Sequence, residues 1–220
     1  MKTLLSWSSG KDSAWALRVL RSDPRYDVAG LLTTVNRAAG RVAMHAVRLE
    51  LLHAQAASAE LPLHVVEIPS PCSNEEYECA MGAAVAAAVA EGVKAVAFGD
   101  LFLEDIRVYR EQKLSGSGMQ PLFPLWGRDT RELAEEMIAS GLRARLTCVD
   151  PRVLPASFAG REFDASLLRD LPEGIDPCGE RGEFHSFAYA GPMFSHPIGV
   201  IGGEVVERDG FVFADLMPAQ

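Results

Sequence analysis

The sequence predicts an α/β fold, and two observations carry that prediction. Over residues 1–126, short apolar runs that suit buried parallel strands alternate with stretches of helical spacing. After residue 126 this alternation weakens, and an Asp-Gly pair between apolar runs indicates a β-hairpin. We therefore expect a parallel sheet with helices on both of its faces over residues 1–126, followed by a smaller α+β domain over residues 127–220.

The first predicted strand and helix flank a loop of small residues. Residues 3–7 form a short apolar run, and residues 14–20 place apolar side chains at helical spacing. Glycine lets a backbone come close to a ligand, and the free N–H groups and dipole of a helix start attract anions. Lys11 adds a positive charge, and Asp12 is suited to hold Mg²⁺ on the same phosphates. We therefore predict a phosphate site made by Ser8, Ser9, Gly10, Lys11, Asp12 and Ser13.

This loop differs from a Walker A loop, which requires Gly-x4-Gly-Lys-Ser/Thr. Leu5 occupies the first glycine position, and Asp12 follows the lysine. The alternative interpretation is a Ser/Gly turn into a helix with no ligand. Because strand, loop and helix follow in the order that a phosphate site needs, we favour the phosphate site.

The elements that follow continue the alternation. Helix starts and ends carry their own signals, such as a capping box at Ser73 and Glu76 and a glycine at position 92. We expect strands at 26–34, 63–68 and 93–98, a loop at 35–41, and helices at 44–60, 77–91 and 103–113.

Ligands of a doubly wound sheet bind beyond the carboxyl ends of its strands. Thr33 lies near the end of the second expected strand, and Gly99 and Asp100 follow the fourth. We therefore expect these three residues beside the loop 8–13. The charged helix 103–113 fits a solvated face, but its position after a strand end makes one of its arginines a candidate for phosphate contact.

The second part of the chain is expected to be mixed. An Asp-Gly pair at 209–210 joins two apolar runs into a hairpin, whose apolar faces would also allow a homodimer. The first part is expected to end with a strand at 122–126. For the second part we expect strands at 145–149, 184–189, 198–206 and 211–213, and helices at 129–140 and 165–171.

Composition narrows the class of protein. Hydrophobic residues make up 48% and charged residues 23%, and no apolar run reaches the ~20 residues of a membrane span. The net charge of −9 argues against a broad nucleic-acid surface, which needs many lysines and arginines. No signal peptide is evident. The cysteines (Cys72, Cys79, Cys148 and Cys178) form no CxxC pair, so we expect reduced thiols in a cytoplasmic protein.

Residues 176–187 form a second stretch of unusual chemistry. The segment combines carboxylates, a thiol and an imidazole with glycines that allow a substrate to approach closely. Glu180 and Glu183 are suited to orient an amine, hold a metal or act as a base. The alternatives are a polar loop before an edge strand, and a Cys178 nucleophile with His185 as its base. The candidate substrate-binding residues here are Cys178, Gly179, Glu180, Gly182 and Glu183.

Four stretches together resemble the diphthine–ammonia ligase family, in the adenine nucleotide α-hydrolase (PP-loop ATP pyrophosphatase) group. They are Ser8–Ser13, Met44-His45, the Pro-Leu-Trp-Gly-Arg-Asp run at 124–129, and residues 176–184 with their Cys-Gly-Glu-x-Gly-Glu-Phe core. The first occurs across many ATP pyrophosphatases, whereas the last two are far more specific. At Ser9 the loop departs from the family pattern, which has glycine there. The short, alanine-rich chain resembles an uncharacterised bacterial relative.

The resemblance implies a Rossmann-like (HUP-type) ATP-binding domain and a smaller substrate-binding domain. ATP, with Mg²⁺, would convert a small-molecule or protein-borne carboxylate into an acyl-adenylate and release pyrophosphate, and ammonia would displace AMP. Lys11, Asp12 and Glu183 would be the catalytic residues, with Glu183 facing the acceptor carboxyl or the ammonia. Nucleotide contacts would include Thr33, Met44, His45, Gly99 and Asp100, and substrate contacts would include Trp126 and Arg128.

Two other functions stay open at this point. A tRNA-modifying ATP pyrophosphatase shares the loop, but it would need a catalytic cysteine pair and a basic surface, neither of which is evident here. A nucleotide-binding regulatory protein without catalysis would have no need of the carboxylates at 176–187. We therefore favour the amide-forming ligase.

Overall fold

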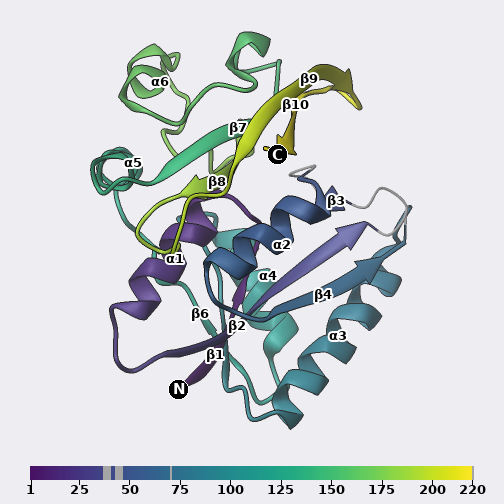
Figure 1. Cartoon of the computed structure of the whole chain (residues 1–220). Coiled ribbons are helices and arrows are strands. Elements are labelled where there is room, and N and C mark those ends of the chain that lie inside the picture. The colour runs from purple at the N-terminus through teal and green to yellow at the C-terminus, as the bar shows by residue number, and fades with distance from the viewer. Residues whose placement is uncertain (37–40, 43–46, 70, 220) are drawn as a thin grey trace.

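The computed structural model describes residues 1–36, 41–42, 47–69 and 71–219 (Figure 1). It contains a mostly parallel sheet from the first part of the chain and an antiparallel sheet from the second. The predicted fold class, a Rossmann-like α/β part followed by a smaller α+β part, is confirmed.

The first sheet is six-stranded and is built outward from β1. β2 and then β4 are added on one side of β1, and β5 and then β6 on the other, all of them parallel. The short β3 pairs antiparallel with the end of β2. The strand order therefore reverses between β1 and β5, the point where doubly wound sheets bind ligands. The strands are β1 (Lys2–Ser6), β2 (Asp27–Asn36), β3 (Arg41–Val42), β4 (Leu63–Ile68), β5 (Ala95–Ala97) and β6 (Gln120–Leu122).

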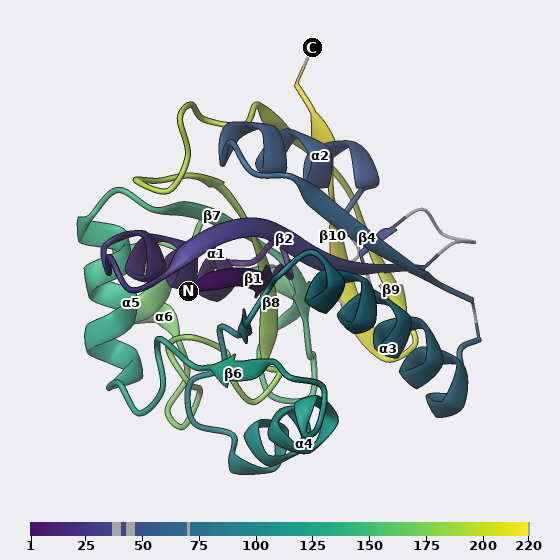
Figure 2. The same cartoon turned by 90° about the horizontal axis from the view of Figure 1, so that it is seen from below.

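Helices cover both faces of this sheet, as predicted, and Figure 2 shows α2 and α3 on opposite sides of it. Because side chains alternate along a strand, Leu5 and Leu31 enter a main core with α1 and α2. Their neighbours Leu4 and Leu32 enter a smaller core with α3. The helices are α1 (Lys11–Arg21), α2 (Leu49–Ser58), α3 (Asn74–Ala90) and α4 (Glu104–Leu114).

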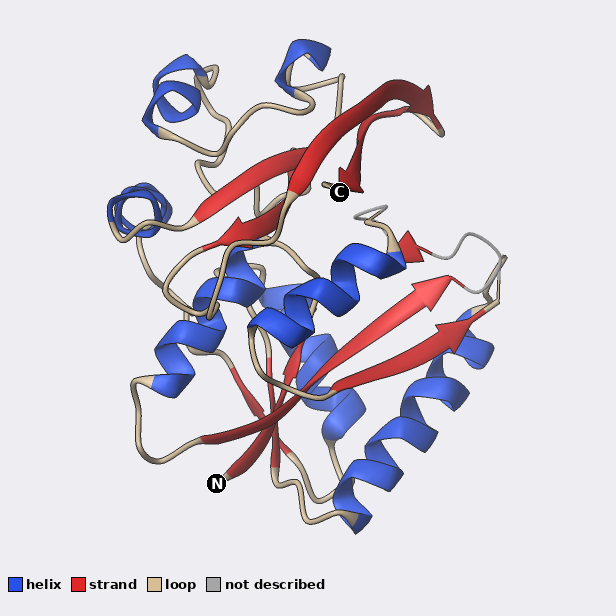
Figure 3. Cartoon of the chain, viewed as in Figure 1, coloured by secondary structure: helices blue, strands red, loops and turns tan. Residues whose placement is uncertain are grey.

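The second sheet is antiparallel in the order β8-β7-β10-β9 (Figure 3). The predicted hairpin joins β9 and β10 through Asp209 and Gly210, whose φ angles of 52° and 80° suit a tight turn. The main core continues from the first sheet into β7 and β8, so the two sheets pack together. The elements are α5 (Thr130–Ala139), β7 (Arg143–Val149), the 3₁₀ helix Ala156–Phe158, α6 (Ala165–Asp170), β8 (Phe184–Ala190), β9 (Val200–Arg208) and β10 (Phe211–Pro218).

Several boundaries differ from the prediction, and local contacts explain why. β2 continues to Asn36, inside the loop expected at 35–41, because its last residues pair with the end of β4. α2 begins at Leu49, later than the expected residue 44, because Arg48 has an extended backbone and its guanidinium pairs with Asp215 of β10. The strand expected at 122–126 ends at Leu122, because residues 124–127 form a turn.

The predicted capping box is confirmed at the start of α3. The Ser73 hydroxyl accepts the Glu76 N–H, and the Glu76 carboxylate accepts the Ser73 N–H at 2.8 Å. α3 begins directly after this cap, three positions before the predicted start at residue 77. The domain boundary expected between residues 126 and 127 falls between β6 and α5, and it stays a prediction.

Candidate functional site

A pocket of about 600 Å³ lies at the carboxyl ends of β1 and β5, the point where the strand order reverses. The first sheet contributes the loop after β1, Thr33 near the end of β2, and Gly99 and Asp100 after β5. The second part of the chain contributes residues 178–180 and the start of β8. The structure therefore brings together two stretches that are some 170 positions apart in the sequence. The predicted site residues that line the pocket are Ser8, Lys11, Asp12, Ser13, Thr33, Gly99, Asp100, Cys178, Gly179 and Glu180.

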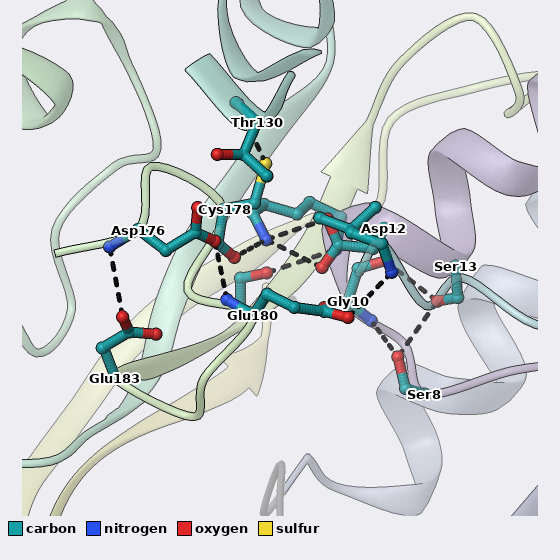
Figure 4. Close-up of polar contacts among 12 residues, drawn as sticks. Ser8, Gly10, Asp12, Ser13, Thr130, Asp176, Cys178, Glu180 and Glu183 are labelled. Atoms are coloured by element: carbon teal, nitrogen blue, oxygen red, sulfur yellow. Dashed lines mark hydrogen bonds and ion pairs between the residues drawn. The ribbon is translucent and has the colours of Figure 1, made fainter. Parts of the chain in front are cut away.

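The loop 8–13 is held by its own hydroxyl groups (Figure 4). The Ser8 hydroxyl donates to the Ser13 hydroxyl at 3.2 Å, and the Ser13 hydroxyl donates to the Gly10 carbonyl at 3.0 Å. Ser9 has a φ of 68°, in the left-handed region that favours glycine. This explains why a glycine is usual at that position. Gly10 caps α1 without a side-chain bond. The Gly10 N–H donates to the Ser8 hydroxyl at 3.4 Å and the Lys11 N–H donates to the Ser186 hydroxyl at 3.2 Å, so an anion at this helix start would compete with these two hydroxyls.

Gly99 brings the end of β5 against this loop. A Cβ atom at Gly99 would lie 3.0 Å from the Asp12 carbonyl carbon and 3.0 Å from the Ser13 nitrogen. Both atoms belong to backbone, which has little room to move. Glycine is therefore required here for the close approach of two backbones, and this packing accounts for its place beside the site.

Gln55 of α2 fixes the loop from behind and was missed by the sequence prediction. Its fully buried amide accepts the Trp7 indole N–H at 2.9 Å and donates to the carbonyls of Ser9 and Ala188 at 2.9 and 2.6 Å. One side chain thus joins β1, the loop and β8. A glutamine within an alanine- and leucine-rich helix was the available signal, but its partners are distant in the sequence.

Lys11 reaches across from α1 to the second part of the chain. Its ammonium lies 2.8 and 3.0 Å from the Asp12 carboxylate oxygens and donates to the Cys178 carbonyl. The rings of Phe163 and Phe184 lie with their centres 5.5 and 5.4 Å from the ammonium. Burial alone would lower the pKa of Lys11, but the surrounding negative groups outweigh it and raise that pKa. Lys11 is therefore a buried cation.

Glu180 is the carboxylate that the second part of the chain presents to the pocket. Its side chain accepts the Leu101 N–H at 2.7 Å, which links it to the segment after β5. Burial raises the pKa of Glu180 to about 7, and the nearby carboxylates of Asp12 and Asp100 act in the same direction. A group with this pKa can exchange protons near neutral pH.

Glu183 lies outside the pocket and binds to its own loop. Its carboxylate oxygens accept the backbone N–H groups of Asp176 and Arg181 at 3.1 and 2.9 Å, and it does not line the pocket (Figure 4). The Asp176 carboxylate in turn accepts the Glu180 N–H at 2.8 Å. Glu183 thus closes the loop that carries Glu180. The catalytic role of Glu183 stays a prediction.

Asp100 pairs with Arg110 of α4. The guanidinium donates to both carboxylate oxygens at 2.5 and 3.0 Å and lies over the Phe98 ring, 4.4 Å from its centre. Both charged side chains line the pocket. Arg110 is therefore the arginine of α4 that is placed for the phosphate contact expected of this helix.

Thr33 lines the pocket, and its hydroxyl is buried without a hydrogen-bond partner. A buried hydroxyl without a partner costs free energy, so a polar ligand atom at this position would stabilise it. This fits a nucleotide, which carries polar atoms on its base, sugar and phosphates.

Some predicted site residues fall outside the pocket. The Trp126 ring packs on Phe123 and on the Arg107 guanidinium, 4.8 Å from the ring centre. Arg128 forms an ion pair with Glu136 of α5. Gly182 takes a left-handed φ of 87° in the turn before Glu183. Ser9 and Gly10 shape the loop from behind without lining the pocket. Met44 and His45 lie outside the described residues.

The alternative in which Cys178 is a nucleophile gains no support from its surroundings. The thiol donates to the Thr130 carbonyl at 3.3 Å, and burial raises its pKa far above the ordinary value. Burial lowers the pKa of His185 to about 4, so the imidazole is neutral at pH 7. A thiol held in its protonated form is a poor nucleophile.

No group of three potential metal ligands of the His, Cys, Asp or Glu type occurs among the residues that the structure describes. This does not conflict with Mg²⁺ on a nucleotide, because Mg²⁺ is commonly held by one or two carboxylates together with phosphates and water. Asp12 fits that pattern beside the phosphate loop. None of the described helices has the length and apolar character needed to cross a membrane.

The fold and the pocket define a doubly wound α/β protein whose pocket lies at the switch point of the sheet, with a second sheet that completes the site. Comparison with known families agrees with this class. Residues 1–121 match the diphthamide synthase N-terminal domain, and residues 129–213 match the diphthamide synthase C-terminal domain. The chain therefore belongs to the diphthamide synthase family.

Curated relatives carry the name diphthine–ammonia ligase. The chain is 32% identical to the Bos taurus protein over 129 residues, which are 56% of this chain and 48% of that protein. It is 28% identical to the Homo sapiens protein over 153 residues (67% and 57%) and 34% identical to the Danio rerio protein over 130 residues (56% and 50%). The chain thus spans about half the length of the curated relatives it matches.

Proposed function

We propose that this chain is an ATP-dependent, AMP-forming ligase that converts a carboxylate into an amide with ammonia. One observation carries the proposal: the phosphate-type loop 8–13 and the Glu180 carboxylate line one pocket at the switch point of the sheet. Membership of the diphthamide synthase family and relatives named diphthine–ammonia ligase support it.

The nucleotide would bind with its phosphates at the start of α1. Backbone N–H groups of the loop and the helix dipole attract the phosphates, and Lys11 adds a full charge. The Thr33 hydroxyl offers a hydrogen bond to the same ligand. When bound, Mg²⁺ on Asp12 would neutralise charge on the phosphates. Bound phosphates give the Lys11 ammonium an alternative to its present partner, Asp12.

Activation would proceed by attack of the acceptor carboxylate on the α-phosphorus. A bond forms between a carboxylate oxygen and that phosphorus, and the bond to the bridging oxygen of the β-phosphate breaks. The products are an acyl-adenylate and pyrophosphate. Lys11 and the start of α1 stabilise the negative charge that leaves with pyrophosphate.

Amide formation would follow on the acyl-adenylate. Ammonia attacks the carbonyl carbon, one proton leaves the nitrogen, and the bond to AMP breaks. Glu180 is the proposed base for that proton, because its pKa of about 7 leaves a large ionised fraction at neutral pH. We assign Glu183 the positioning of the Glu180 loop, in place of the catalytic role predicted from the sequence.

The test is release of AMP and pyrophosphate from ATP with Mg²⁺, ammonium and a pool of cell metabolites as the source of the acceptor. Lys11→Met and Asp12→Asn should each lower the rate at least 100-fold. Glu180→Gln should keep pyrophosphate release and lower amide formation at least 100-fold. Glu173→Gln, an exposed glutamate, serves as the matched control.

Full turnover by Lys11→Met would contradict this proposal. ATP binding by calorimetry without cleavage in the presence of any acceptor fraction would instead favour a nucleotide-binding regulatory protein. A loss of amide formation in the double variant Glu180→Gln and Glu183→Gln that exceeds the loss in Glu180→Gln alone, with unchanged stability, would restore a direct role for Glu183.

A further inference from the structure

A second cavity opens off the pocket, between α3 and α4. It has a volume of about 330 Å³, and we call it the α3–α4 compartment. Its lining is mainly apolar. It shares wall residues with the larger pocket, so the two spaces adjoin, and we call them together the connected site. The shared residues are Tyr77, Met81, Val85, Phe98, Arg110 and Leu114.

α3 contributes both large and small side chains to the compartment. Among its seventeen residues Ala88 is the one that is buried, although the helix covers a face of the sheet. Gly82 and Ala86 line the compartment, and a Cβ atom at Gly82 would meet nothing within 4 Å. Both residues are exposed, so α3 leaves the compartment open at these two positions.

The charged groups at the compartment are already paired. Arg110 holds Asp100 with two hydrogen bonds, and Lys113 pairs with Glu78 at 2.5 Å. The other shared wall residues carry a thioether, aliphatic groups and aromatic rings, and Tyr77 adds one phenol hydroxyl. A charged guest would have to break one of these pairs, whereas an apolar guest would bury surface at no such cost.

The polar end of the connected site lies on the other side. There the loop 8–13 and the Thr33 hydroxyl offer hydrogen bonds and charge to the nucleotide. A nucleotide bound with its phosphates on that loop and a hydroxyl group on Thr33 leaves the apolar side for the second substrate. Small-molecule sites commonly combine an apolar cavity with a few convergent polar groups.

We propose that the α3–α4 compartment binds the apolar body of the acceptor. The acceptor is then a small-molecule carboxylate on an aromatic or aliphatic body, with its carboxylate directed out of the compartment toward the α-phosphate. This inference rests on the proposed ligase function and names the substrate class of the same site.

A direct test uses the methyl group of Met81 as a reporter of occupancy. The full chain is labelled with ¹³C at the methionine methyl groups, and Met81→Leu assigns the signal. The protein is saturated with Mg²⁺ and α,β-methylene-ATP, which cannot be cleaved between these phosphates. 4-Phenylbutyrate and octanoate should then shift the Met81 signal, and succinate should not. A shift with succinate, or no shift with either apolar carboxylate, would overturn the inference.

Filling the compartment provides the second test. Gly82→Leu should weaken binding of 4-phenylbutyrate at least tenfold and change the affinity for α,β-methylene-ATP less than twofold. Leucine has a higher helix propensity than glycine, so this variant should fold. Ala83→Leu, one position along and outside both cavities, is the matched control and should change neither affinity.

The two proposals fail in different ways. Absence of α,β-methylene-ATP binding in the natural sequence would remove the proposed function, and the inference with it. Nucleotide binding with unchanged 4-phenylbutyrate affinity in Gly82→Leu would remove the inference alone. A large loss of nucleotide affinity in Gly82→Leu would assign the compartment to the nucleotide and would also overturn the inference.

Discussion

α1 and α3 cover opposite faces of the same sheet, yet they are buried to very different extents. Seven of the eleven residues of α1 are buried, against one of the seventeen of α3. α1 contacts both the parallel sheet and β8, so apolar surface surrounds it (Figure 1). The other face, with α3, borders the α3–α4 compartment. The molecule thus has a tightly packed wall behind the phosphate-type loop and a loosely packed wall beside the second cavity.

The largest effect on stability is expected from shortening an apolar side chain in α1, compared with a similar change in α3. Leu17 of α1 is fully buried, so Leu17→Ala should lower the free energy of unfolding by about 3–5 kcal/mol. Val85 of α3 is only partly buried, so Val85→Ala should cost about 1 kcal/mol. Urea unfolding followed by circular dichroism measures both. Similar losses in the two variants would show that α1 and α3 do not differ in how tightly they pack.

The hydrogen bonds that Gln55 makes behind the loop 8–13 should give the next largest effect on stability. Gln55→Ala removes a partner from the Trp7 indole N–H and from the Ala188 carbonyl, at about 1 kcal/mol or more each. It also removes a hydrogen bond to the Ser9 carbonyl, which keeps the Ala188 N–H as a partner. We expect a loss of about 3 kcal/mol in urea unfolding. Gln112→Ala, at an exposed position of α4, is the control and should change stability by less than about 0.5 kcal/mol. A loss of less than about 1 kcal/mol in the free energy of unfolding of Gln55→Ala would show that Gln55 does not fix the loop.

Glu180, which the second part of the chain contributes to the pocket, makes the stability of the fold depend on pH. Its pKa in the fold, about 7, lies above its ordinary value of 4.5, so the unfolded chain ionises first as pH rises. The ionised group therefore destabilises the fold increasingly between about pH 4.5 and pH 7. Glu180→Gln should gain stability relative to the natural sequence over that range, by about 2 kcal/mol after allowance for partial exposure.

The measurement is the difference in the free energy of unfolding between Glu180→Gln and the natural sequence, determined by urea unfolding from pH 4.5 to 8. The difference is needed because the lowered pKa of His185, about 4, acts in the opposite direction. A neutral imidazole in the fold makes stability rise with pH between about 4 and 6.5. A difference that stays constant with pH would show that Glu180 titrates normally.

Ser9 should give the smallest effect. Its φ of 68° is strained for a residue with a Cβ, so Ser9→Gly should raise the free energy of unfolding by up to about 1 kcal/mol. Ser115 has an ordinary φ of −57°, and Ser115→Gly is the control that should lose stability slightly. Thermal unfolding would detect both changes. A loss in Ser9→Gly would show that the serine hydroxyl matters more than the backbone angle.

The sequence by itself determined features that depend on neighbouring residues. Examples are the strand, loop and helix around residues 8–13, the capping box at Ser73 and the Asp-Gly hairpin. Such features depend on periodicity and on hydrogen bonds within a few positions, which a pattern records. The fold class followed from the same local signals, because strands that alternate with helices leave few topologies.

Only the tertiary structure decided which side chains share the pocket. Glu180 and Glu183 are the same residue type three positions apart, and the turn at Gly182 sends one toward the pocket and the other back onto its own loop. Gln55 and the α3–α4 compartment likewise depend on residues brought together from distant positions. Partners of this kind are set by packing between elements, and no local pattern in the chain encodes them.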